Sequence, residues 1–199
     1  MLAISVKYNF KIITTLFALL YAVITLLFFN FYRELAIKDA RQEAIFILDT
    51  MNAIRDYVSE VQRPLIDELK EKKMLVHDFF DPRLLSSSYI TREIYNKKQK
   101  KKNINYDYKL IAYNPLNPAH EGNNFEHDIL DDFKEGKYEE YSKIIEENDK
   151  RYFFVGLPIH NSHPSCVQCH TSNSAPKRML EQYPNIPKFE SKVGDVIAM

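Results

Sequence analysis

Residues 12–31 read IITTLFALLYAVITLLFFNF, a run of twenty residues without a charged side chain. A helix rises about 1.5 Å per residue, so this run is long enough to cross the roughly 30 Å hydrocarbon core of a membrane. The run leads straight into Tyr32 and Arg33 without a small-residue cleavage site. A buried core helix is the alternative, but it would need apolar surroundings on every side. We therefore predict an uncleaved anchor over residues 1–32.

The residues after the anchor predict a long helix. Neither Gly nor Pro occurs before Pro64, which favours a helix over strands and turns. Apolar residues follow one another at steps of four and three, in the order Ala40, Ala44, Ile47, Met51, Ile54, Val58, Val61 and Leu65. This stripe is typical of a helix that forms a homodimer or packs on its own domain, and both remain open. We expect a juxtamembrane helix over 33–64, continuous with the anchor and ended by Pro64.

Residues 65–199 predict one mixed domain of class α+β. We expect a helix at Ser88–Tyr95, a solvated loop at Asn96–Asn105, a strand at Tyr106–Tyr113, a helix capped by Asn123 and Glu126 that runs through Phe133, a hairpin of Tyr138–Ile145 with Tyr152–Ile159, and a last strand at Gly194–Met199. The last strand stops without a turn. We therefore expect the domain to be truncated there and the chain to continue beyond Met199.

Charge and composition exclude several classes of protein. Lys and Arg together number 27, equal to Asp and Glu, so no net charge attracts nucleic acid. The lysine-rich run in 96–105 has no interleaved aromatic residues, which argues against a nucleic-acid partner. A hydrophobic share of 45% excludes a disordered chain. The histidines lie without a carboxylate or nucleophile pattern, so we do not expect an enzyme.

Both cysteines of the chain lie in PSCVQCHTSNSAP, residues 164–176. In a helical turn Cys166, Cys169 and His170 share one face, because residues three and four apart are neighbours there. Two thiols at this spacing form thioethers with the two vinyl groups of a haem, and the adjacent imidazole reaches the iron. The motif predicts one covalent haem c, attached through Cys166 and Cys169, with His170 as the proximal iron ligand.

Three other interpretations of the cysteine motif are less favoured. A structural zinc needs four ligands, and there is no second cysteine pair. A redox dithiol belongs between a strand and a long helix, yet TSNSAP breaks a helix at once. A disulfide across two residues would be strained. Because c-type haem is attached outside the cytoplasmic membrane, we expect residues from about Arg33 onward in the periplasm or outside the cell.

Several stretches together carry a family resemblance. The order NPLNPAHEGNNFEHDILDDF, RYFFVGLPI, CVQCHTSNSAP, YP and GDVIAM, within about Ile45 to Met199, resembles the c-type haem sensor family of PAS-like fold. Domains of that family occur as ectodomains of bacterial histidine kinases and chemoreceptors. The resemblance implies a PAS-like antiparallel sheet, Cys166 and Cys169 as thioether cysteines, and His170 as proximal ligand. Ala175 and Pro176 match the turn after the haem site, whereas Thr171 stands where the family commonly has Gly.

Two functions fit these features. One is a membrane-anchored sensor input domain, in which haem redox state or a bound small gas shifts the long helix. The other is a tethered monohaem cytochrome for electron transfer. We expect any sixth iron ligand to come from the segment between Met51 and His77, with Met51, Met74 and His77 as candidates. We expect His120 to be an exposed loop residue.

Overall fold

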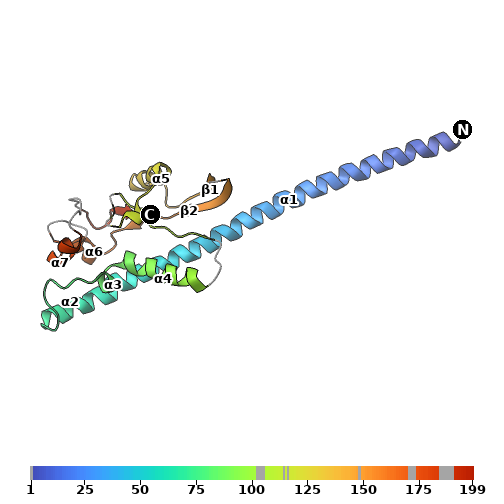
Figure 1. Cartoon of the computed structure of the whole chain (residues 1–199). Coiled ribbons are helices and arrows are strands. Elements are labelled where there is room, and N and C mark those ends of the chain that lie inside the picture. Colours follow the sequence, from blue (N-terminus) through green and yellow to red (C-terminus); the bar gives the residue numbers. More distant parts are fainter. Residues whose placement is uncertain are drawn as a thin grey trace. The chain divides into compact units, whose positions relative to one another are not determined.

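The computed structural model describes residues 2–101, 106–113, 115, 117–147, 149–169, 174–183 and 191–199. The chain divides into two compact units, Met1–Ala44 and Ile45–Met199. The first unit consists of helix, and the second contains every other element. Helix α1, Leu2–Tyr57, begins in the first unit and ends in the second (Figure 1).

The anchor predicted at the N-terminus lies in α1. Its apolar side chains are exposed, with Phe17 at 68% and Tyr21 at 73%. The most apolar window has a mean hydropathy of 2.5. Of the helices in the described part of the chain, this one alone is long and apolar enough to cross a membrane. The length and composition suit a membrane span or a signal sequence.

The long helix does not end at Pro64, so this prediction was wrong. Helix α1 passes into a π-helical turn, η1 at Val58–Gln62, and then into α2 at Arg63–Glu71. The backbone N–H of Arg63 donates to the carbonyl of Val58, five residues earlier. Proline has no N–H and clashes with the carbonyl four residues before it in a regular α-helix. The wider π turn accommodates Pro64 and lets the chain stay helical.

Part of the apolar stripe packs on the protein's own domain. Within the second unit, Ile47, Met51 and Val58 are buried, with exposures of 7%, 3% and 1%. Val61 and Leu65 remain exposed, because the π turn changes the angular spacing of the residues that follow it. Of the two alternatives for the stripe, packing on the domain accounts for its three buried residues.

A short helix precedes the next long helix. Helix α3, Pro82–Leu85, has Asp81 as its N-cap, and α4 follows at Ser87–Lys101. Helix α4 contains the predicted Ser88–Tyr95 helix but continues to Lys101, so the loop predicted for residues 96–101 was wrong. Lysine is a good helix former and is favoured in the last turn of a helix, where it meets the negative end of the dipole. Residues 102–105 of the predicted loop lie outside the described residues.

Helix α5, Asn124–Lys134, confirms the predicted capping pair. The side chain of Asn123 accepts from the N–H of Glu126 at 2.9 Å, and Glu126 accepts from the N–H of Asn123 at 2.8 Å. The buried side of α5 forms the main apolar cluster with one residue from the middle of the domain and the last residue of the chain: Ile111, Ile129, Leu130, Phe133 and Met199.

The strands confirm the predicted hairpin and last strand. Strands β1, Tyr141–Glu147, and β2, Lys150–Gly156, pair antiparallel with Tyr141 opposite Gly156. Strand β3, Ile159–His160, pairs antiparallel with β4, Val196–Ala198. The class α+β is confirmed. In the described residues these pairs are two separate two-stranded sheets, and the single PAS-like sheet stays a prediction.

The strand predicted at Tyr106–Tyr113 is not formed. Only the end of this segment pairs: Ile111 exchanges two backbone hydrogen bonds of 2.9 Å with Met199, and Ala112 forms an isolated bridge with Glu121. Two of the tyrosines that suggested a strand, Tyr106 and Tyr108, pack on α4 instead. The rings of Tyr106 and Tyr108 lie 6.3 and 5.6 Å from the ring of Tyr95. Aromatic residues favour strands and helix contacts alike, and here tertiary packing decided.

Candidate functional site

A cavity of about 690 Å³ lies within the unit Ile45–Met199. This volume falls in the range of about 300 to 1,000 Å³ that is usual for small-molecule and cofactor sites. Its apolar wall includes Phe80, Leu85, Leu110, Met179 and Ile197. Its polar wall includes three arginines and the two thiols of the chain. The cavity therefore suits a ligand that is mostly apolar and carries a few polar groups.

The two cysteines lie on helix α6, Pro164–Cys169. The side chain of His163 starts this helix, because its Nδ1 accepts from the N–H of Ser165 at 3.2 Å. Cys166 and Cys169 are three residues apart, so they share one face of the helix, and both line the cavity. Both are free thiols and half-buried. Burial raises the pKa of the Cys169 thiol above its usual value.

Arg63 joins helix α6 to the long helix. Its guanidinium is buried and donates to two backbone carbonyls: Nε and Nη2 to Leu85 at 3.0 and 2.9 Å, and Nη1 to Ser165 at 2.7 Å. The α2, α3 and α6 segments are thus held by one side chain. A buried charge requires such hydrogen bonds, because desolvation without them costs several kcal/mol, on the order of 3 to 5.

A second contact joins the π turn to α6. In π geometry the carbonyl of Ser59 would be the acceptor for the N–H of Pro64, which proline lacks. The Ser59 carbonyl instead accepts from the hydroxyl of Ser165 at 3.4 Å. The irregular turn of the long helix therefore contacts the helix that bears the cysteines.

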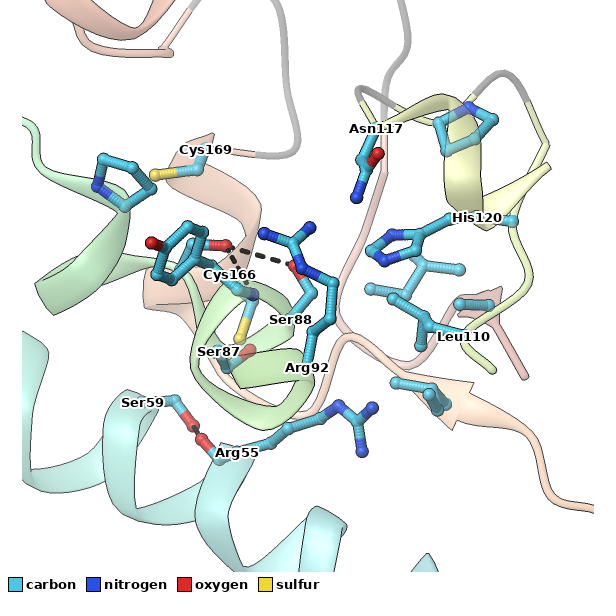
Figure 2. Close-up of a pocket in the computed structure, with 18 of the residues that line it drawn as sticks. Arg55, Ser59, Ser87, Ser88, Arg92, Leu110, Asn117, His120, Cys166 and Cys169 are labelled. Carbon is cyan, nitrogen blue, oxygen red and sulfur yellow. Dashed lines mark hydrogen bonds between the residues drawn. The ribbon is translucent and has the colours of Figure 1, made fainter. Parts of the chain in front are cut away.

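The other end of the cavity is cationic. Arg55 comes from α1, Arg92 from α4, and His120 from the 3₁₀ turn η2, Pro118–His120. In Figure 2 the two cysteines lie on one side of the view and Asn117 and His120 on the other, with Arg92 between them. Three segments that are distant in the sequence thus bring their basic side chains to one region of the cavity.

His120 is a neutral, buried imidazole. It is 9% exposed, and burial, followed by the charges of Arg92, Arg55 and Lys109, lowers its pKa to about 4. Its position is set by Asn117, whose side chain accepts from the N–H of Ala119 at 3.2 Å and caps η2. The expectation that His120 is an exposed loop residue was wrong.

The structure brings together Cys166 and Cys169 of the predicted site. The predicted proximal ligand, His170, lies outside the described residues. None of the three candidates for a far-side ligand lines the cavity: Met51 is buried in the helix packing, Met74 is 69% exposed, and His77 is also exposed. The segment between Met51 and His77 does line the cavity, but through other residues: Asn52, Arg55, Asp56, Ser59 and Arg63.

The basic residues of the site carry no recognisable signal in the sequence. Arg55 belonged to the charged side of the long helix, and Arg92 to a short helix without a recognised role. No local pattern singles them out. The only signal near His120 is the Pro- and Asn-rich stretch NPLNPAHEG, residues 114–122. This composition predicts a turn and does not predict a cavity wall.

Comparison with known proteins agrees with this architecture. The crystal structure of the cyanobacterial heme-protein Tll0287 matches with a TM-score of 0.58 and 14% sequence identity, and the match covers 81% of this chain and 91% of that one. At this identity the likeness shows the fold alone. No curated protein matches the sequence. The model of the Tll0287-like family matches residues 33–199. Since this match spans most of the sequence, the chain belongs to the Tll0287-like family.

Proposed function

We propose that this chain carries one haem, bound covalently in the cavity through Cys166 and Cys169, with His170 as the proximal iron ligand. The observation that carries the proposal is that both thiols of the chain line one ligand-sized cavity from one face of a short helix. The cyanobacterial heme-protein Tll0287 supports it, because a haem protein has the same fold.

The residues present fit a haem. A haem is a flat apolar ring with two vinyl groups for thioether attachment and two carboxylates on another edge. The cavity has thiols at one end, apolar side chains such as Phe80, Leu85 and Met179 along its wall, and arginines at the other end. When bound, a haem supplies one-electron exchange or gas binding at its iron. The chain's own residues attach it, shield it from water and set the charge around it.

We further propose that the domain is a sensor input domain of PAS-like kind, which faces the periplasm or the outside and is anchored by residues 1–32. The contacts of Arg63 and Ser59 with Ser165 support this role, because they link the cysteine helix directly to the long helix. The π turn η1 is the irregular part of the long helix and contacts the cysteine helix, so it is a candidate for the element that shifts when the haem changes state. An electron carrier would need no such link.

Covalent attachment is tested first. The full chain is produced with a cytochrome c maturation system and run on a denaturing gel stained for haem. We expect the haem to stay with the polypeptide, and acid acetone to leave it attached. Complete extraction of the haem would contradict covalent binding.

The sensor role is tested on the same haem-loaded protein. Hydrogen exchange of the backbone around Val58–Gln62 is compared between the ferric and the ferrous protein. We expect exchange there to depend on the redox state or on a bound gas, while α5 serves as an internal control that does not change. Identical exchange in every state would favour the electron carrier.

A further inference from the structure

The cationic end of the cavity holds two arginines that, among the described residues, form no hydrogen bond to a carboxylate. Arg55 donates from Nη1 to Asn52 Oδ1 at 2.8 Å and from Nη2 to the hydroxyl of Tyr108, which are both neutral acceptors. Arg92 Nε forms a long ion pair with Glu93 Oε1 at 3.6 Å, which is too far for a hydrogen bond, and the Glu93 side chain is 41% exposed. The Arg92 guanidinium also lies 5.0 Å from the Tyr89 ring centroid.

The acidic group on the wall does not neutralise these arginines. Asp56 lines the cavity, yet among the described residues it forms no ion pair with Arg55 or Arg92. Arg63 differs from both, because each of its three guanidinium nitrogens already donates to a backbone carbonyl. Arg55 and Arg92 therefore have more donor capacity left for a ligand than Arg63 has.

The imidazole of His120 lies at the same end of the cavity. The charges of Arg92 and Arg55 contribute, after burial, to the lowered pKa of its imidazole. Both charges therefore act on the same small region of the cavity. An anion placed there would relieve this repulsion, whereas an uncharged ligand would leave two cations facing a partly desolvated space.

The guanidinium fork is suited to carboxylates. Its paired N–H groups match the two oxygens of a carboxylate, and such charge-assisted bonds are about twice as strong as neutral ones. A haem attached at its vinyl edge to Cys166 and Cys169 has two carboxylates on another edge of the ring. Arg55 and Arg92 together are as many as these carboxylates.

We propose that Arg55 and Arg92 bind the two propionate carboxylates of the haem, so that the group is held by thioethers at one edge and by ion pairs at another. This inference rests on the proposed haem site. It assigns to the chain's basic residues the orientation of the ring within the cavity, a task that two flexible thioether bonds perform incompletely.

The test uses the full chain with its haem attached and three substitutions: Arg55→Gln, Arg92→Gln and, as a control, Arg83→Gln. Arg83 is an exposed arginine that pairs with Asp81 and does not line the cavity. The readout is the resonance Raman band of propionate bending, which responds to hydrogen bonds at the carboxylates. We expect this band to shift in both cavity variants and to stay in place in the control. Arg55→Lys and Arg92→Lys keep the charge without the fork and should give smaller shifts.

The outcomes separate the two proposals. Absence of any haem band in the wild-type protein defeats the haem site itself. A haem-loaded protein in which all four cavity variants keep the wild-type propionate band overturns the present inference and leaves the haem site standing. Calorimetric titration of the loaded protein with inorganic phosphate is the last arm. Binding that disappears in Arg92→Gln would show that the arginines serve a free anion, which also overturns the inference. If the Gln variants load no haem, the Lys variants decide.

Discussion

The two ends of the cavity are built in different ways. At one end Cys166 and Cys169 lie within the six residues of α6, so a single turn of helix places both thiols. At the other end Arg55, Arg92 and His120 come from α1, α4 and η2, which are separated by long stretches of chain. The first end is a local motif, and the second exists only when the domain is folded. Damage to the thiol end should therefore remove the cofactor, whereas damage to the cationic end should change its environment.

The largest expected effect is at the thiol end. Replacing both Cys166 and Cys169 with Ala removes both thioether positions, so we expect complete loss of haem staining on denaturing gels. Met74→Ala is the matched control, because Met74 is 69% exposed and lies away from the cavity. It should stain like the wild type. Haem that still migrates with the double variant would mean that attachment occurs elsewhere.

Arg63 lies at the thiol end, where it donates to Ser165 of α6, and its loss should cost the most stability. Arg63→Met leaves the buried carbonyls of Leu85 and Ser165 without their donor, which we expect to cost about 2 to 4 kcal/mol in the free energy of unfolding. Urea unfolding of the full chain in detergent measures this. The control Arg83→Met removes an exposed arginine and should cost much less. Equal losses of unfolding free energy in the two variants would show that the hydrogen bonds of Arg63 to Leu85 and Ser165 add no particular stability.

A pH effect comes next and concerns the cationic end of the haem-free protein. His120 has a pKa of about 4 in the folded domain against an ordinary value of 6.5. Between these values the unfolded chain binds a proton that the folded chain does not, so stability falls as the pH falls from about 6.5 to about 4. The loss is at most about 3 kcal/mol.

His120→Gln isolates this effect. Thermal unfolding of the variant should depend less on pH in that window than unfolding of the wild type. A carboxylate near the imidazole raises its pKa, so propionates at Arg55 and Arg92 should weaken the pH dependence in the haem-loaded protein. An identical pH profile for variant and wild type would contradict the burial of a neutral His120.

The smallest effect compares two helix caps. Asn117→Ala removes the cap of η2, and Asn123→Ala removes the cap of α5, and each should cost about 1 kcal/mol or less. Only Asn117 holds His120 at the cavity. We therefore expect only Asn117→Ala to shift the haem absorption spectrum, while both variants lower the unfolding midpoint. An absorption shift of equal size in Asn123→Ala would contradict the specific role of the Asn117 cap in positioning His120.

Local patterns predicted the elements that depend on neighbouring residues. The long helical start, the capping box of Asn123 and Glu126, and the β1–β2 hairpin are confirmed because backbone preferences and i to i+3 contacts decide them. The failures are at places where a distant partner decides. Pro64 was expected to end a helix, but the π turn absorbs it, and Tyr106 and Tyr108 were expected in a strand, but they pack on Tyr95.

By itself the sequence determined the anchor-like apolar run, the helix that follows it and the paired thiols at Cys166 and Cys169, because each is a property of adjacent residues. Only the tertiary structure decided that Arg63 joins the cysteine helix to the long helix, that His120 is buried, and that two further arginines share the cavity with the thiols. The physical reason is that a side chain's charge state and partners depend on which segments exclude water around it. Segments far apart in the sequence meet only when the core of Ile111, Leu130 and Met199 has formed.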